Sequence, residues 1–143
     1  MRSIHRLAGL LALLSGVTMC VVGGPTRASA QFTPTDVYVF QALTILGNYS
    51  AALDLAAQRG DILATSRLFK ACAADLYSLP IFGVDPQAVA IVRSGARVCD
   101  SLGSAVLELN DPTVPNEAKT LRALELMARL ADLADQLERL QRG

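Results

Sequence analysis

Two cysteines, Cys72 and Cys99, are the residues of this chain best suited to covalent chemistry. They lie 27 positions apart, far from the C-x-x-C spacing of redox enzymes, so a catalytic thiol pair is disfavoured. The segment at residues 1–30 predicts secretion, and secreted proteins keep such pairs oxidised. The sequence therefore predicts a structural disulfide between Cys72 and Cys99. In the loop-entropy account it would stabilise the fold by about 3.5 kcal/mol.

The other side chains offer little for catalysis. The single histidine, His5, lies in the segment that we expect to be removed. A mature chain without imidazole has no Ser-His or Cys-His pair, no Glu-x-x-His iron site and no histidine-ligated haem. Asp75 and Asp100 stand near the cysteines in sequence, but the acids are scattered along the chain, and we interpret both as surface residues. The sequence predicts a protein that is not an enzyme, with no cofactor and no metal site.

Two tyrosines are candidates for a ligand pocket. Tyr38 and Tyr49 are eleven positions apart, which places both on one face of a helix. Their rings could line a cavity with the hydroxyl groups turned towards a ligand. Such a pair more often belongs to the core of a helical bundle, and we favour that interpretation.

The first 30 residues have the pattern of a secretory signal peptide. Arg2 and Arg6 precede an apolar stretch at residues 7–22, and residues 28–30 (Ala-Ser-Ala) form a cleavage motif. We expect cleavage after this motif and a secreted or periplasmic protein. The alternative is a retained membrane anchor, which is disfavoured because the apolar stretch is short for a membrane-spanning helix.

Residues 31–143 are expected to form one folded domain. Removing the signal segment leaves 10 basic and 13 acidic side chains, a net charge of −3. A nucleic-acid-binding protein would show a basic excess, and no stretch of this chain has one. We therefore expect no nucleic acid as a partner, and contact with a membrane only through the signal segment if it is not cleaved.

The elements that position these residues are four helices with well-marked ends. Apolar residues recur at spacings of three and four, and no segment shows the alternation of a strand. Thr33, Asp61 and Asp85 are suited to cap helices, and Gly60 and Pro80 to end them. Short connections between long helices favour antiparallel neighbours. The sequence predicts an all-α, up-down-up-down four-helix bundle with helices at residues 34–59, 62–79, 86–109 and 115–142.

The connection at residues 80–84 is unusually apolar. The second predicted helix is shorter than the others, so this loop must rise along the bundle. We expect Ile81, Phe82 and Val84 to fill the core at the end that the short helix leaves open.

Small residues surround one of the cysteines on the third predicted helix. Gly95, Cys99 and Gly103 stand four positions apart and so form a ridge on one helix face. Packed helices normally lie 8–10 Å apart, whereas the Cα atoms of a disulfide lie within about 6.8 Å. The ridge is expected to let the second helix approach closely enough for Cys72 to reach Cys99.

The fourth predicted helix has more apolar surface than one core-facing stripe requires. Its leucines at 126, 130, 133, 137 and 140 form a heptad stripe. A second set lies outside that stripe, and either the other helices wrap around it or a partner docks on it. This second set consists of Leu121, Leu124, Ala128 and Ala131.

Two functions are compatible with this sequence. The first is an exported, non-catalytic protein-interaction module that binds an unknown protein partner or associates with itself through the fourth helix. The second is a carrier that holds an apolar small molecule in the bundle interior near Tyr38 and Tyr49. Bundles host many unrelated activities, so the fold alone does not choose between them.

Overall fold

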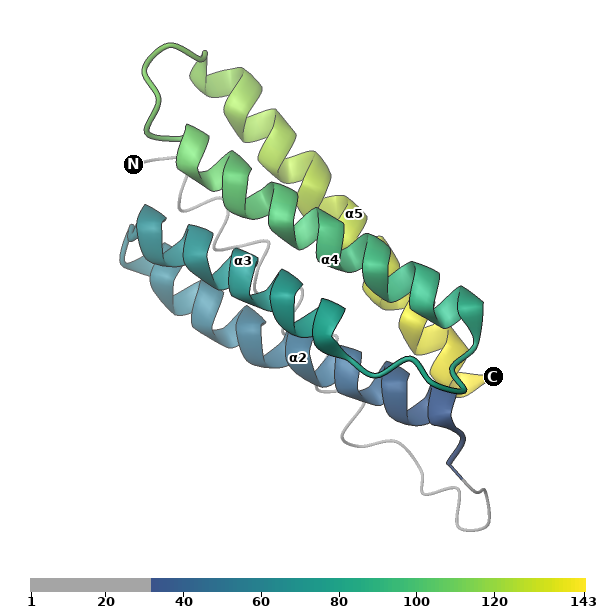
Figure 1. Cartoon of the computed structure of the whole chain (residues 1–143). Helices are drawn as coiled ribbons and strands as arrows, with labels where there is room; N and C mark the ends of the chain where they lie inside the picture. The colour runs from purple at the N-terminus through teal and green to yellow at the C-terminus, as the bar shows by residue number, and fades with distance from the viewer. Residues whose placement is uncertain (1–31) are drawn as a thin grey trace.

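The computed structural model describes residues 32–143 as four α-helices (Figure 1). None of the four is both long and apolar enough to span a membrane. No strand occurs in these residues, and the all-α prediction is confirmed with every helix boundary within one residue of its expected position. The predicted signal peptide at residues 1–30 lies outside the described part of the chain. The helices are α2 (Pro34–Gln58), α3 (Ile62–Ser78), α4 (Pro86–Glu108) and α5 (Asn116–Arg142).

Capping side chains start three of these helices. The Oγ1 atom of Thr33 accepts a hydrogen bond from the Asp36 amide at 3.1 Å, and the Asp36 carboxylate accepts one from the Thr33 amide at 2.9 Å. This reciprocal arrangement satisfies two amides at the start of α2. Asp61 and Asp85 cap α3 and α4 through their carboxylates, whereas α5 follows Pro115 without a side-chain cap. The local sequence therefore sets three of the four starting points.

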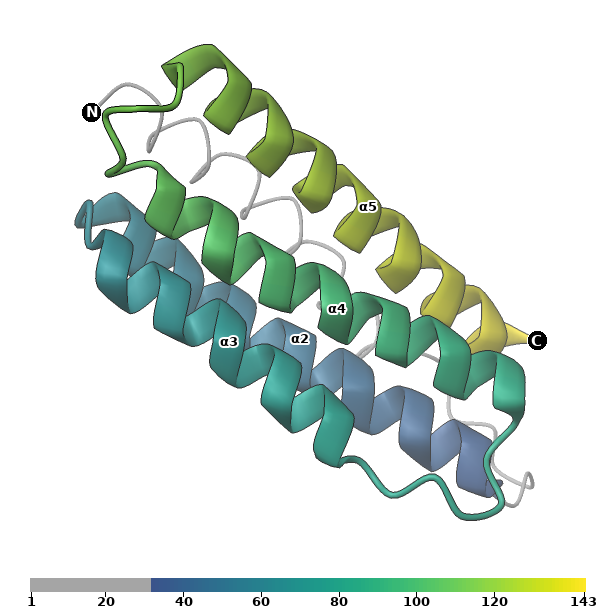
Figure 2. The same ribbon diagram turned by 45° about the horizontal axis from the view of Figure 1, so that its top comes forward.

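Consecutive helices run antiparallel and lie side by side (Figure 2). The most extensive contact joins α3 to α4, followed by α4 to α5 and α2 to α3. Helix α2 also contacts α5, which closes the bundle, and it touches α4 least. The arrangement agrees with the predicted four-helix bundle.

Side chains from all four helices fill the interior. Phe69, Leu102 and Met127 are among the largest that are fully buried. In α5 the buried stripe differs from the predicted leucine stripe, because alternate leucines of that stripe pack at the edge of the core. The buried positions of α5 within the core are Ala123, Met127, Leu130, Ala134 and Leu137.

The prediction that the 80–84 loop fills the core is wrong for two of its three residues. Ile81 is exposed, and Phe82 is 96% exposed, while Val84 packs partly buried against the core. A hydrogen bond from the Val84 amide to the Ile81 carbonyl at 3.2 Å closes a turn, and Gly83 adopts a φ of 74° in it. That turn places Phe82 at its outer corner.

Tyr38, near the start of α2, belongs to the buried core at the same end of the bundle as the 80–84 loop. Tyr38 is 2% exposed, and Arg93 of α4 lies close enough to act on the pKa of its hydroxyl group. The core at this end therefore contains Tyr38 but neither Ile81 nor Phe82. The expectation that Tyr38 belongs to the core is confirmed by its burial.

Candidate functional site

The two cysteine side chains meet between α3 and α4. Their Sγ atoms are 3.7 Å apart, and the Cys99 thiol donates a hydrogen bond to the Cys72 sulfur. Both residues are buried. The hydrogen bond to Cys72, together with burial, raises the pKa of the Cys99 thiol. The sulfurs are adjacent but not bonded, so the structure supports the pairing and not the disulfide itself.

The two glycines of the ridge face different helices. A Cβ atom at Gly103 would lie 2.9 Å from Cγ of Lys70 on α3, so the absence of a side chain there permits close packing of α3 on α4. The nearest neighbour of Gly95 is instead Leu130 of α5, 4.0 Å from its would-be Cβ atom. Only the Gly103 part of the ridge serves the approach of α3.

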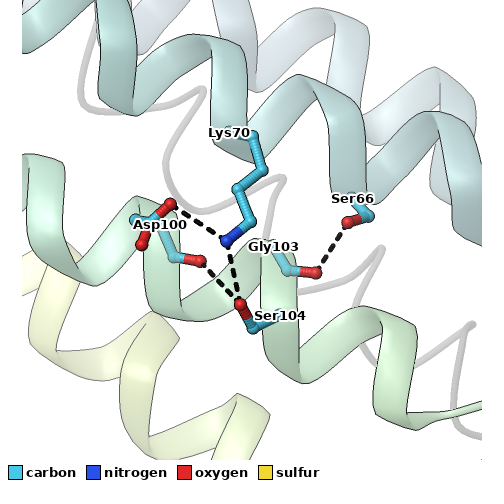
Figure 3. A network of polar contacts seen from close by, with 5 residues as sticks. All are labelled: Ser66, Lys70, Asp100, Gly103 and Ser104. Carbon is cyan, nitrogen blue, oxygen red and sulfur yellow. Dashed lines mark hydrogen bonds and ion pairs between the residues drawn. The ribbon is translucent and has the colours of Figure 1, made fainter.

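A polar network crosses the same helix pair (Figure 3). The Lys70 ammonium group donates to the Asp100 carboxylate at 3.0 Å and to the Ser104 hydroxyl group at 2.9 Å. The buried Ser66 hydroxyl group donates to the Gly103 carbonyl at 2.7 Å. These contacts join α3 to α4 at the close approach of Lys70 to Gly103.

The two carboxylates singled out from the sequence are both engaged in contacts between helices. Asp100 pairs with Lys70, and Asp75 accepts a hydrogen bond from the Tyr49 hydroxyl group at 2.5 Å. Both acids are exposed, as interpreted from the sequence. They lie on different helices with different partners, and this arrangement does not pair two carboxylates for acid–base chemistry.

The two tyrosines occupy different environments. Tyr38 is buried, and burial raises its pKa while the nearby Arg93 guanidinium partly offsets the rise. Tyr49 packs at the edge of the core, and its hydrogen bond to Asp75, reinforced by desolvation, raises its pKa to about 12. Tyr49 therefore joins α2 to α3 at the position where the sequence placed a candidate ligand contact.

The proposed partner face on α5 is uneven. Leu121 is 59% exposed and Ala128 is also exposed, whereas Leu124 and Ala131 are partly buried. Among residues 116–142, Leu121 is the only large apolar side chain that is exposed. A partner at this face would contact mainly Leu121.

A larger exposed apolar group lies at the end of the bundle where α2 begins. Phe32 and Phe82 are 83% and 96% exposed, and Ile81 and Val37 are also exposed. The would-be Cβ atom of Gly83 lies 3.5 Å from the Pro34 ring, so the loop and the start of α2 are in contact. We call Phe32, Ile81 and Phe82 the phenyl end. The sequence did not predict this surface, because no local sequence pattern distinguishes an exposed apolar turn from a buried one.

A buried lysine organises the connection between α4 and α5. Lys119 is buried, and its ammonium group donates to the Asp111 carbonyl. Hydrogen bonds from Thr113, aided by the charge of Lys119, lower the pKa of the Asp111 carboxyl group. The lysine thus supplies a cation and a donor near the carboxyl end of α4, where backbone carbonyls lack helical partners.

Within residues 32–143 no group of three or more histidine, cysteine or acidic residues is placed to hold a metal ion. Searches of protein families, curated proteins and solved structures gave no match to this chain. The described residues define a small helical bundle with a buried thiol pair and an exposed phenyl end, and its function is inferred from these features.

Proposed function

We propose that this protein is an exported, non-catalytic protein-interaction module. The observation that carries the proposal is the phenyl end, with Phe82 at 96% exposure on a fixed turn. The Asp85 amide donates to the Thr35 hydroxyl group at 2.9 Å, which ties the loop to α2. An aromatic side chain held on an ordered turn loses little conformational freedom on binding, and phenylalanine is among the residues enriched in protein interfaces.

The composition of the rest of the bundle supports binding over catalysis. The sole histidine of the chain precedes the described residues, and Asp75 and Asp100 are engaged in contacts between helices. Leu121 at the opposite end of the bundle offers a second, smaller apolar contact. Two separated apolar groups suit a protein that contacts one partner or that links two.

Site-specific photocrosslinking in the producing cells tests this function. A benzoylphenylalanine at position 82 is expected to give a discrete protein adduct whose yield falls when Phe32→Ser is added. The control carries the same probe at Gln58, an exposed position at the far end of α2. No adduct from position 82, or equal labelling from both positions, would contradict the proposal.

Export and oxidation of the thiol pair form part of the same proposal. Disulfide formation would bring the two sulfurs from 3.7 Å to the bond length of about 2.05 Å. Their shared burial between two packed helices supports that closure. Intact mass of protein secreted by an export-competent host should show loss of residues 1–30 and of two hydrogens, and reduction should cost about 3.5 kcal/mol of stability. A secreted chain that keeps residues 1–30 would exclude the cleavage, and one that keeps both thiols reduced would exclude the disulfide.

The alternative, a carrier of an apolar molecule near Tyr38 and Tyr49, has weaker support. Tyr38 is packed in the core, and the Tyr49 hydroxyl group already has Asp75 as its partner. Native mass spectrometry separates the two functions, because a carrier would retain extra mass that disappears on denaturation.

A further inference from the structure

The exposed side of the α3–α4 hairpin carries two parallel rows of side chains. On α3, Leu63, Lys70 and Tyr77 stand seven positions apart, and on α4 Arg93, Asp100 and Leu107 do the same. Residues seven apart on a helix share one face. The ion pair between Lys70 and Asp100 places the two rows beside each other (Figure 3). Together with Arg67 and Arg97, these residues form what we call the outer face.

The outer face is basic although residues 31–143 have a net negative charge. Lys70 is paired with Asp100, the single acid of this face. Arg67, Arg93 and Arg97 are exposed, and none of them forms an ion pair with another described residue. Three uncompensated positive charges therefore project from two neighbouring helices.

Apolar side chains accompany these charges. Leu63, Tyr77 and Leu107 are each about half exposed. Because α3 and α4 run antiparallel, Leu63 and Leu107 lie towards one end of the outer face, and Tyr77 and Arg93 towards the other. Arginine and tyrosine are enriched in protein interfaces, and the apolar part of an interface is covered by the partner.

We propose that the outer face binds an acidic segment of a partner protein. Carboxylates of that segment would pair with Arg67, Arg93 and Arg97, and its apolar side chains would cover Leu63 and Leu107. The planar guanidinium group of arginine can pair with a carboxylate through two hydrogen bonds, and the exposed Leu63 and Leu107 favour a segment that also has apolar side chains. The proposal rests on the interaction function above and adds the charge of the partner and a second surface.

The net negative charge of residues 31–143 also argues against nonspecific attraction of an acidic partner. A chain of net charge −3 repels acidic polymers at long range, so binding to one requires a local positive surface. Attraction between the arginines and carboxylates must weaken as salt screens it, over a Debye length of about 10 Å at 0.1 M.

The test uses a fluorescein-labelled peptide of seven Glu-Glu-Leu repeats and the purified mature protein. Anisotropy should show binding at 50 mM salt that weakens at least tenfold at 300 mM, and no binding of the corresponding Lys-Lys-Leu peptide.

The triple variant R67E/R93E/R97E should lose at least tenfold in affinity for the acidic peptide. The control R59E/R129E/R139E changes the net charge equally at exposed positions elsewhere and should lose less than threefold. Circular dichroism verifies that both variants fold, and R67Q/R93Q/R97Q provides a milder substitution.

Several outcomes would overturn the proposal. Equal loss in both triple variants would mean that net charge alone governs binding. Arginine-dependent binding to vesicles with 30% phosphatidylglycerol, without binding to the acidic peptide, would assign the outer face to anionic lipid. If position 82 gives no adduct but the acidic peptide still binds, the phenyl end is rejected as a binding surface and this inference stands. If position 82 gives an adduct but the acidic peptide does not bind, only the acidic partner is rejected.

Discussion

The thiols of Cys72 and Cys99 are poorly placed to react with solutes. Both residues are buried, and the hydrogen bond between them together with burial raises the pKa of Cys99, which keeps that sulfur protonated near neutral pH. The thiolate is the nucleophilic form, so we expect reduced, folded protein to react with iodoacetamide at least a hundredfold more slowly than unfolded protein. Mass spectrometry of timed samples measures both rates. Rapid modification of the folded chain would show that this helix pair opens easily.

Tyr49 and Asp75 make a pH-dependent contribution to stability. Hydrogen bonding to Asp75 raises the pKa of Tyr49 from 10.0 to about 12, so the contribution is present below pH 10 and is lost as the pH rises towards 12. At pH 8 we expect Tyr49→Phe to cost only about 0.5–1 kcal/mol, because the bond is exposed to solvent. Urea unfolding of both proteins between pH 8 and 11.5 measures the difference, which should shrink with rising pH. A difference that stays constant would exclude this role for the hydroxyl group.

The exposure of Phe82 leads to an unusual expectation for a large aromatic residue. Phe82→Ala should change the free energy of unfolding by less than about 0.5 kcal/mol, since surface substitutions rarely do more. Leu102→Ala serves as the matched core substitution and should cost about 2–5 kcal/mol, because Leu102 is fully buried. Denaturant titration compares the two. A large loss from Phe82→Ala would return this residue to the core, as the sequence first suggested.

At the scale of elements, the two glycines of α4 are not equivalent. Alanine is favoured over glycine inside a helix by about 1 kcal/mol. Gly95 has room for a methyl group, so Gly95→Ala should stabilise the protein by about 0.5–1 kcal/mol. Gly103→Ala places a methyl group within 3.1 Å of three Lys70 carbons, and the displaced lysine should cancel that gain. Thermal unfolding of both variants tests the contrast, and equal stabilisation would contradict the close approach described for Gly103.

The elements themselves are well encoded locally. Thr33, Asp61 and Asp85 cap helices where the sequence places them, because a capping side chain bonds amides only two or three positions away. The 80–84 loop instead packs on Pro34, and the Asp85 amide that follows it bonds to Thr35, about fifty residues away in sequence. No local pattern contains that information, and apolar content alone wrongly suggested a buried loop.

At the scale of the whole molecule, the outer face too could not be predicted from local sequence patterns. Arg67 on α3 and Arg93 and Arg97 on α4 are too far apart in sequence to form a basic stretch. The pairing of two helices brings them to one side, and the contact between Lys70 and Asp100 marks the register of that pairing. The pairing of Cys72 with Cys99, in contrast, could be anticipated because these are the two cysteines left after residue 30.

The order of the helices also determines how the chain reaches its structure. The three most extensive contacts each join helices that follow one another directly, so few long loops must close before contacts form. Proteins dominated by such local contacts fold in microseconds to milliseconds. We expect stopped-flow refolding of the reduced chain to finish within about 10 ms, and a main phase slower than one second would contradict this. A hairpin can then form as soon as its second helix is available, so this topology suits a polypeptide that emerges gradually from a narrow channel.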